Sequence, residues 1–320
     1  MDLLSRKISV QAPAKVNLFL KVLGRRADGY HDLETWMQKI DLYDFLELEL
    51  HSGDQIEFST DDTSIPTDEA NIAVKAAMVF FQASKKRKGT GVKINLRKKI
   101  PVAAGLGGGS SDAGAVLRGL NNLFDCEFSE KQLIELARQL GADVPFFVVD
   151  HDAVFAEGIG DIMYHVDSVR NCSFVIVNPD FFVSTAWVFQ NLTLTSLSKN
   201  SKLSCFQKYK TESLSLQDLH NDLEKVTSAK YPEIEKIKST LLAAGASNVL
   251  MSGSGPTVFG IFRDSETVAS DLNRIVGELR QEYGEKVFLS RACTGASPSG
   301  KAPGFDPGIR RFESCRPSHH

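Results

Sequence analysis

The 320-residue sequence predicts an α+β fold in two parts, in which strands and helices mix rather than alternate as regular βαβ units. Two observations predict this class. Several strand-like segments follow one another near the N-terminus, and a mixture of short strands and helices returns in the second half. We expect one part over 1–167 and a second over 168–293. Residues 294–320 are rich in Gly, Pro, Ser and Arg without periodicity, which predicts a disordered tail outside both parts.

The first part opens with strand patterns that surround one helix. Apolar residues that alternate with polar ones predict four strands, at 8–12, 15–23, 42–50 and 92–96. Before the last of these, Ala73, Ala77 and Phe81 fall on one stripe and predict a helix over 67–84. Several strands that follow one another with only one helix between them favour an α+β fold over a regular parallel sheet.

Two more helices are predicted in the middle of the chain. Small residues predict one over 111–123, and amphipathic spacing predicts another over 129–140. Ser129, with Gln132 three residues later, is a capping-box pattern that marks the start of the second of these helices. Gly141 follows directly and is expected to end it.

The second part is predicted to be a compact α+β sandwich. Short apolar segments predict four strands, at 173–177, 248–251, 257–262 and 286–290. Helical periodicity predicts two longer helices, at 231–244 and 265–283. Residues 192–216 are polar and rich in Ser, Thr and Lys, so we expect a surface excursion there.

Composition and charge narrow the classes of function. A net charge of -3 leaves no basic footprint for nucleic acid or for an anionic membrane. No apolar run approaches the roughly 20 residues that span a bilayer, and the N-terminus shows no secretory signal pattern. The five cysteines form no C-x-x-C pair, so neither a zinc site nor a disulfide framework is indicated. We therefore expect a cytoplasmic protein with free thiols and with neither a nucleic-acid nor a membrane partner.

The most informative segment is the glycine-rich stretch between Pro101 and Ala113. Four of the five residues at 105–109 are glycine, two serines follow, and a helix is predicted directly behind them. Glycine brings bare backbone close to a ligand, and the first N–H groups of a helix lack partners and carry partial positive charge. Together they predict a cradle for a di- or triphosphate. Neither a Walker A nor a Rossmann pattern fits, because no lysine follows the glycines and the sixth position counted from Gly105 is Ser110.

Three motifs resemble those of the GHMP kinases and follow one another along the chain in the order that the family has. The glycine-rich stretch matches their central signature, and segments 12–18 and 251–257 match the signatures near the N-terminus and late in the chain. The resemblance implies a ribosomal S5 domain 2-like N-terminal domain followed by a ferredoxin-like α/β sandwich. It also implies ATP as phosphoryl donor, a small-molecule alcohol as acceptor, and Mg²⁺ accompanying the ATP. The residues then expected to bind ATP are Asn71 near the adenine and, around the phosphates, Pro101, Gly105, Leu106, Gly107, Gly108, Gly109, Ser110 and Ser111.

The resemblance assigns the chemistry to Lys15 and Asp143. Phosphoryl transfer needs positioning, charge neutralisation and a group that takes the proton of the acceptor hydroxyl. We expect Asp143 to be that base and Lys15 to steady the hydroxyl or the developing alkoxide. From the residues alone, an Asp in this turn is as readily a cap residue, and a strand lysine is usually solvated. No carboxylate cluster marks a seat for the metal, and Ser111 is a candidate by resemblance only.

Within the family, segments 26–31 and 141–147 resemble the members that phosphorylate the 2-hydroxyl of 4-diphosphocytidyl-2-C-methyl-D-erythritol in the methylerythritol phosphate pathway to isoprenoid precursors. The resemblance places cytosine between Tyr30 and Phe189, with His31 at its edge. An aromatic face can stack a base, and a histidine can bond the edge of a pyrimidine.

Asn17 and Thr185 are the remaining residues expected to contact the acceptor. Two other interpretations stay open: another small-molecule kinase of the family, of the mevalonate or homoserine type, and a non-catalytic nucleotide-binding protein of the same fold. Segment 26–31 argues against the first, and the intact Lys15 and Asp143 argue against the second. For the oligomeric state, we expect a monomer or a weak homodimer.

Overall fold

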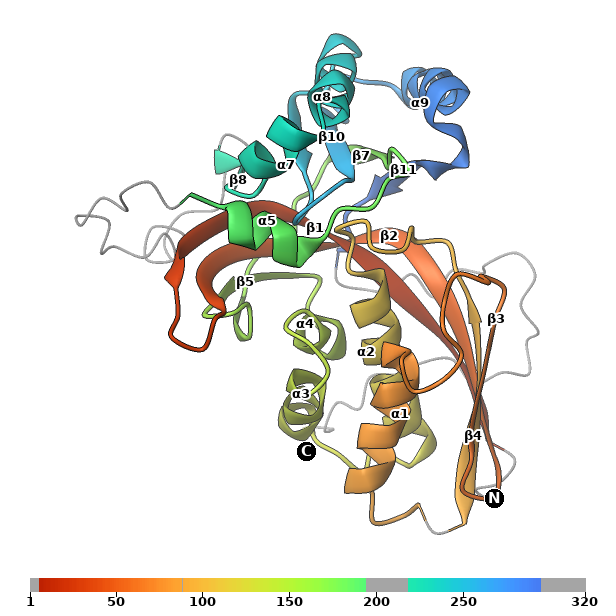
Figure 1. The fold of residues 1–320 in the computed structure, drawn as a ribbon. Helices are drawn as coiled ribbons and strands as arrows, with labels where there is room; N and C mark the ends of the chain where they lie inside the picture. The colour runs from red at the N-terminus through yellow and green to blue at the C-terminus, as the bar shows by residue number, and fades with distance from the viewer. Residues whose placement is uncertain (1–5, 88, 194–217, 295–320) are drawn as a thin grey trace, which may run out of the picture.

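The computed structural model describes residues 6–87, 89–193 and 218–294 (Figure 1). In these ranges the chain forms two β-sheets and the helices that cover them, which confirms the predicted α+β class. The prediction of a tail over 294–320 lies almost wholly outside the described residues, as does most of the excursion predicted over 192–216. Among the described helices, none combines the length and the apolar character that crossing a membrane requires.

The first sheet is built on two long strands that curve across the molecule (Figure 1). These are β1 (Lys7–Arg25) and β2 (His31–Ser52), which pair antiparallel along most of their length. The shorter strands are β3 (Ile56–Thr60), β4 (Thr90–Arg97), β5 (Ala153–Glu157), β6 (Ile162–His165) and β8 (His220–Asn221). The sheet has the order β3-β4-β2-β1-β8, and β5 and β6 extend it beside β2.

The two long strands differ from the predicted ones for identifiable reasons. One strand replaces the two predicted at 8–12 and 15–23, because β1 continues through Pro13 with a shift in register directly after it. The strand predicted at 42–50 is only the outer part of β2. Residues 34–40 of β2 are all buried and therefore show no alternation that sequence inspection could detect.

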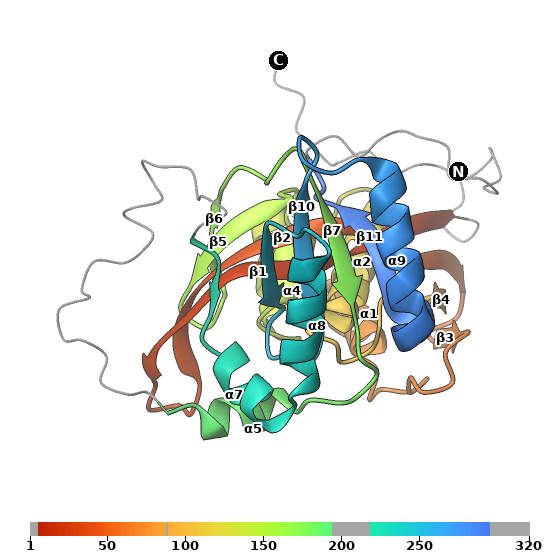
Figure 2. The same ribbon diagram turned by 90° about the horizontal axis from the view of Figure 1, so that it is seen from above.

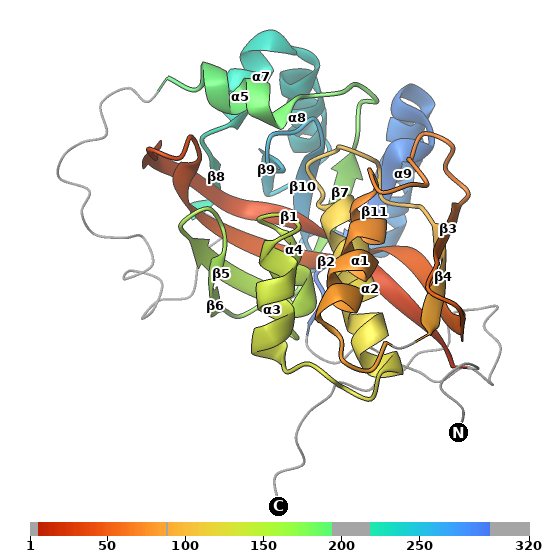
Figure 3. The same ribbon diagram turned by 60° about the horizontal axis from the view of Figure 1, so that its bottom comes forward.

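Four helices pack on one face of the first sheet, below it in Figure 1 and in front of it in Figure 3. They are α1 (Ile72–Ala83), α2 (Gly108–Leu123), α3 (Glu130–Arg138) and α4 (Val144–Val148). The core of this half lies between these helices and β1, β2 and β4. It joins strand residues such as Leu48 and Ile94 to helix residues such as Phe80 and Leu117.

Local capping explains where these helices begin and end. The capping box of Ser129 and Gln132 is present, as predicted. α1 begins directly after Asn71 rather than at residue 67, because the side chain of Asn71 caps its first turn. Gly141 does not end α3 as expected: the helix stops at Arg138, and Gly141 does not adopt a left-handed φ.

The second sheet has the strand order β11-β7-β10-β9, with every neighbouring pair antiparallel. Its strands are β7 (Cys172–Val177), β9 (Asn248–Met251), β10 (Val258–Arg263) and β11 (Val287–Arg291). The helices of this half are α5 (Thr185–Asn191), α7 (Glu224–Lys230), α8 (Glu233–Ala243), α9 (Ala269–Tyr283) and the 3₁₀ turn Gly284–Lys286. α8 and α9 cover the outer face of the sheet (Figure 2), which gives the ferredoxin-like sandwich that was expected.

The two halves share one apolar core between their sheets. Val16 and Trp36 of the first sheet belong to the same buried cluster as Phe174 and Phe259 of the second. β8 also returns from the second half to pair in parallel with β1, in the first sheet. The two sheets are therefore held face to face, and a site can be built from both.

The described cysteines only partly follow the sequence expectation. Cys172 and Cys293 are free thiols, whereas Cys126 is disulfide-bonded, contrary to the prediction. Spacing along the chain could not reveal that bond, because folding decides which thiols meet.

Candidate active site

The first element of the site is the middle of β1, which carries Lys15 and Asn17. The two residues are two positions apart, so their side chains share one face of the strand. The Lys15 ammonium is almost fully buried, and its Nζ lies 2.5 Å from Asn17 Oδ1 and 3.1 Å from the backbone oxygen of Gly105. Asn17 Nδ2 in turn donates to Thr35 Oγ1 at 2.9 Å. Lys15 is thus held by protein oxygens rather than solvated, as a lone strand lysine usually would be.

Asp143 faces the same ammonium. Its Oδ2 lies 3.6 Å from Lys15 Nζ. Asp143 precedes the first residue of α4, but its side chain makes no capping hydrogen bond. The carboxylate is 37% exposed, so it remains open to a ligand while it faces Lys15. The structure therefore brings the predicted pair together, and it leaves the Asp143 side chain out of the capping role that its position alone suggested.

The glycine-rich stretch forms the entrance to α2. The helix begins at Gly108, three residues earlier than predicted, so two of the glycines lie in its first turn. Gly107 has a φ of 70°, and the first helical hydrogen bond runs from Ser111 N to Gly107 O. The amides before that bond have no intrahelical acceptor. A Cβ on Gly105 would lie 2.2 Å from the backbone oxygen of Ser252, so the second half of the chain closes directly onto this loop.

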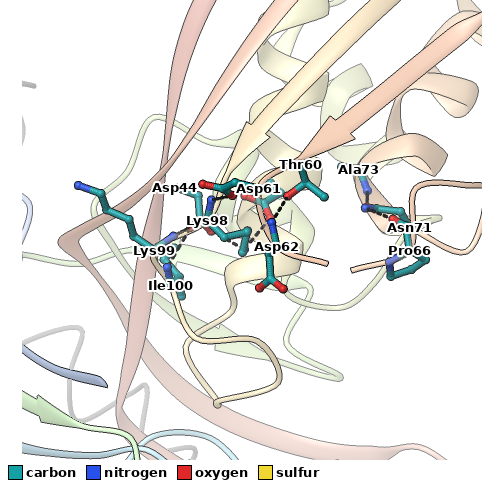
Figure 4. A network of polar contacts seen from close by, with 11 residues as sticks. Asp44, Thr60, Asp61, Asp62, Pro66, Asn71, Ala73, Lys98, Lys99 and Ile100 are labelled. Atoms are coloured by element: carbon teal, nitrogen blue, oxygen red, sulfur yellow. Dashed lines mark hydrogen bonds and ion pairs between the residues drawn. The ribbon is translucent and has the colours of Figure 1, made fainter. Parts of the chain in front are cut away.

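A cavity of about 410 Å³ lies on one side of the loop and is called here the nucleotide cavity. Gly105, Gly107, Gly108, Gly109 and Ser110 line it, together with Asn71 and residues 64–66. Asn71 is buried, and its amide is already engaged: Oδ1 accepts from Ala73 N, and Nδ2 donates to Pro66 O, each at 2.8 Å (Figure 4). Asn71 therefore fixes the 64–66 loop at the rim of the cavity.

Lys98 and Asp112, which line this cavity, belong to a buried charge cluster that the sequence analysis missed. Lys98 bonds Asp112 of α2 at 2.8 Å. It also bonds Asp44, whose other oxygen accepts from the amides of Lys99 and Ile100 (Figure 4). Burial raises the pKa of Asp112 to about 7, although Lys98 opposes the shift. Burial alone would lower the pKa of Lys98, but the two carboxylates raise it above its ordinary value. No short sequence motif indicates the cluster, because its residues come from separate elements.

A second cavity, of about 720 Å³, lies on the other side of the loop and is called here the acceptor cavity. It shares Gly105, Gly107 and Ser110 with the nucleotide cavity. The predicted residues that line it are Lys15, Asn17, Tyr30, His31, Asp143, Thr185 and Phe189. Gly253 and Ser254, from the late motif, line it as well. The two cavities therefore meet at the glycine loop, beside the ammonium and the carboxylate.

Three of the residues predicted to bind ATP line neither cavity. Pro101 is half-buried before the loop. The Leu106 side chain is fully buried in the shared core, while its backbone oxygen accepts a hydrogen bond from Lys15 N at 2.9 Å. Ser111 is buried, and its hydroxyl has no hydrogen-bond partner. Pro101 and Leu106 shape the loop from behind rather than facing the space it encloses.

The far end of the acceptor cavity is aromatic. Tyr30 is 62% exposed at its rim. The His31 ring stacks on Phe189 with centroids 4.9 Å apart and planes 26° apart, and burial lowers the pKa of His31. Thr185 lies at the start of α5, where its Oγ1 is 2.7 Å from Ser254 Oγ. This end therefore offers flat aromatic faces on which a base can stack and an imidazole that can form hydrogen bonds.

Comparisons with known proteins show what this chain is similar to. Models of the GHMP kinases N terminal domain and of the GHMP kinases C terminal region match residues 71–151 and 195–280. The 4-diphosphocytidyl-2-C-methyl-D-erythritol kinase of Desulfotalea psychrophila is 51% identical over 287 residues, which cover 89% of this chain and 95% of that protein. A crystal structure of 4-(cytidine 5'-diphospho)-2C-methyl-D-erythritol kinase matches with a TM-score of 0.71 at 32% identity, over 90% of this chain and 100% of that one. The crystal structure of a homoserine kinase from Cytophaga hutchinsonii also matches, with a TM-score of 0.69 over 91% of this chain and 96% of that one. At 19% identity, this likeness shows a shared fold alone.

Proposed function

The chain belongs to the GHMP kinases, and from that premise we propose that it phosphorylates the 2-hydroxyl of 4-diphosphocytidyl-2-C-methyl-D-erythritol with ATP. The observation that carries the proposal is the meeting of two cavities at Gly105, Gly107 and Ser110, beside Lys15 and Asp143. A donor in one cavity and an acceptor in the other would bring the reacting groups together at that junction. The relatives' names support the choice of acceptor, and their high coverage supports carrying it to this chain.

The proposed step is a transfer of the γ-phosphoryl group across the junction. The free amides at the head of α2 bind the phosphates, since a helix N-terminus favours anions. The acceptor oxygen attacks the γ-phosphorus, the bond to the β-phosphate oxygen breaks, and ADP leaves. Asp143 takes the hydroxyl proton, and Lys15 stabilises the charge that develops on the acceptor oxygen. Asn17 orients Lys15 through the 2.5 Å contact and faces the acceptor.

We also propose that Mg²⁺ accompanies the ATP. Among the described residues, no group of three His, Cys, Asp or Glu side chains could hold a metal. Two oxygens in the first turns of α2 are nevertheless buried without a hydrogen-bond partner, Ser111 Oγ and Asp112 Oδ1. Oxygen ligands suit Mg²⁺, which is usually held by few protein groups together with substrate phosphates. The residues present therefore fit the ion, with Ser111 or Asp112 as its protein ligand, and the bound ion would neutralise phosphate charge.

The cytidine end of the acceptor is proposed to lie at Tyr30, His31 and Phe189. In the present arrangement His31 covers one face of Phe189. We propose that the imidazole moves from that face to the edge of the base when a cytosine lies between Tyr30 and Phe189. The exposed Tyr30 ring is free to close over the base from the rim. Thr185, near the same end, lies on the wall of the cavity and is proposed to contact the acceptor. A cytoplasmic location and a monomer or weak homodimer remain our expectations.

The test is a coupled assay of ADP release with three acceptors at matched concentrations: 4-diphosphocytidyl-2-C-methyl-D-erythritol, mevalonate and homoserine. We expect rapid ADP release with the first and only the background rate with the other two. A preference for mevalonate or homoserine would overturn the acceptor assignment. Nucleotide binding by calorimetry without ADP release for any acceptor would instead favour a non-catalytic role.

A further inference from the structure

One loop from the second half of the chain contacts β1, the glycine-rich stretch and α5. This loop, residues 251–255, is called here the third loop. Its Ser252 Oγ donates to Gly105 O at 2.9 Å and accepts from Asn17 N at 3.3 Å. Ser254 Oγ lies 2.7 Å from Thr185 Oγ1, and Gly253 and Ser254 line the acceptor cavity. The position of the third loop therefore sets the shape of the acceptor cavity next to Asn17.

A short segment, residues 221–227, is hydrogen-bonded to the third loop and is called here the brace. Asn221 Nδ2 donates to two backbone oxygens of the loop, those of Met251 and Gly253, each at 2.8 Å. Glu224 Oε2 accepts from the amide of Met251 at 2.7 Å. Thr227 Oγ1 donates to the backbone oxygen of Ser254 at 3.1 Å. Three side chains of the brace thus bind the backbone of the loop, and none of the three lines the acceptor cavity.

The brace is itself fixed to the strand that carries Lys15. Its first residue, Asn221, belongs to β8 and pairs with Leu20 of β1. Asp222 accepts from the amide of Val22 at 2.7 Å and donates its own amide to Leu20 O at 2.9 Å. Asn221 and Thr227 are buried, 6% and 0% exposed, so solvent does not compete for these bonds. β1, the brace and the third loop therefore form one connected frame.

We propose that Asn221, Glu224 and Thr227 are positioning residues for the acceptor: they hold the third loop against the β1 frame so that the acceptor cavity keeps its shape. This inference rests on the proposed function. None of the three lines either cavity, so they act through the loop and not on substrate. Nor does the nucleotide cavity include any residue of the third loop. Loosening the loop should therefore impair use of the acceptor more than binding of the nucleotide.

The gentlest test is Thr227→Val, which removes the hydroxyl and keeps the volume of a fully buried side chain. We expect the acceptor kcat/KM to fall roughly fivefold to twentyfold, since small misplacements at a reacting centre are costly. The Kd of AMP-PNP, measured by calorimetry without acceptor, should stay within about twofold. Thr227→Ser keeps the donor and should retain most of the acceptor kcat/KM. Equal kinetics for the Val variant and the wild type would overturn the proposal.

A stronger test is Asn221→Asp, which places a carboxylate oxygen where an amide donor faced two carbonyl oxygens. We expect an acceptor kcat/KM lower by roughly tenfold to a hundredfold. The matched control is Asn121→Asp in α2, because Asn121 is also buried and its amide also clamps backbone, at the N–H and C=O of Phe128. The control should lower the melting temperature without changing the ratio of acceptor kcat/KM to nucleotide affinity. A parallel change of that ratio in both variants would mean that general destabilisation explains the result.

The wild-type protein, assayed alongside, separates the two hypotheses. If it releases no ADP with 4-diphosphocytidyl-2-C-methyl-D-erythritol, the proposed function fails. If it is active while Thr227→Val and Asn221→Asp keep normal acceptor kinetics, the function stands and the positioning role fails. Should Asn221→Asp not fold, the Thr227 pair decides the question.

Discussion

The two cavities of the site are built in opposite ways. Every residue that lines the nucleotide cavity lies between Ser64 and Asp112, within one half of the chain. The residues that line the acceptor cavity range from Lys15 to Ser254 and come from both halves. The nucleotide side is thus a local structure, whereas the acceptor side exists only once the two sheets are in place. In a fold built this way, the residues that line the acceptor cavity can change while the nucleotide cavity stays the same.

The largest expected effect lies where the two cavities meet. Asp143→Asn keeps the shape of the side chain but removes the base, so we expect kcat to fall at least ~100-fold, the scale of general-base catalysis. Lys15→Ala should cost a similar factor, because the 3.6 Å partner of the carboxylate is lost. The measurement is a steady-state ADP-release assay with saturating acceptor. Asp271→Asn, an exposed carboxylate in α9, is the control and should leave kcat unchanged. Near-normal turnover in either site variant would show that this pair does not do the chemistry.

The next prediction tests whether Gly105, where the two cavities meet, affects both the nucleotide and the acceptor. Gly105 has a φ of 79° and lies against Ser252 O, so Gly105→Ala both strains the backbone and forces the third loop away. We expect a loss of stability of about 1–3 kcal/mol, the usual cost of such a backbone position. The kcat/KM for ATP and for acceptor should fall together. Urea unfolding and initial-rate kinetics measure the two effects.

Gly109→Ala is the matched substitution for stability. It has no positive φ, and its Cβ would make only an ordinary 3.5 Å contact with Ile72. Its unfolding free energy should equal that of the wild type or exceed it slightly, because alanine favours a helix. If the two alanine variants were equally stable, the close approach of Ser252 to Gly105 would not matter to the fold.

The same contrast explains what the sequence could predict. The nucleotide side is encoded locally: the glycines and the helix that follows them are neighbours in the chain, and local rules detect them. Even here the start of α1 was misplaced, because the cap at Asn71 outweighed the helical periodicity of residues 67–71. The buried Lys98 cluster was missed because its two carboxylates belong to other elements.

The acceptor side was predicted from resemblance to a family rather than from spacing. Nothing in the residues around Lys15 shows that its side chain is buried or that Asp143, 128 positions later, lies 3.6 Å away. The inner half of β2 escaped detection because both of its faces are covered. The brace was missed entirely, since a strand of two residues, His220–Asn221, leaves no periodic pattern. Local sequence patterns cannot predict contacts between the two halves of the chain.

A third prediction sharpens the contrast between the cavities. Tyr30→Ala removes an aromatic face at the far end of the acceptor cavity and touches nothing in the nucleotide cavity. Base stacking is worth ~1–3 kcal/mol, so the acceptor KM should rise roughly fivefold to a hundredfold. The KM for ATP should stay within about twofold. Phe182→Ala is the control, because Phe182 is as exposed as Tyr30 but lines neither cavity. Equal changes in both KM values would contradict the assignment of Tyr30 to the acceptor.

The smallest expected effect concerns the attachment of the brace to β1. His220 Nε2 lies 2.6 Å from Asp222 Oδ1, and this hydrogen bond raises the pKa of His220 above 6.5, against the effect of burial. Because the folded pKa is the higher one, the stabilisation is fully present below about pH 6.5 and is lost as the pH rises through the folded pKa. The pair is half-exposed, so solvent screening limits its contribution to under ~1 kcal/mol. Urea unfolding at pH 6 and pH 8.5 should therefore show the wild type losing slightly more stability than His220→Gln over that interval. An identical loss in both proteins would mean that the charge on His220 does not help to hold the second half of the chain against β1.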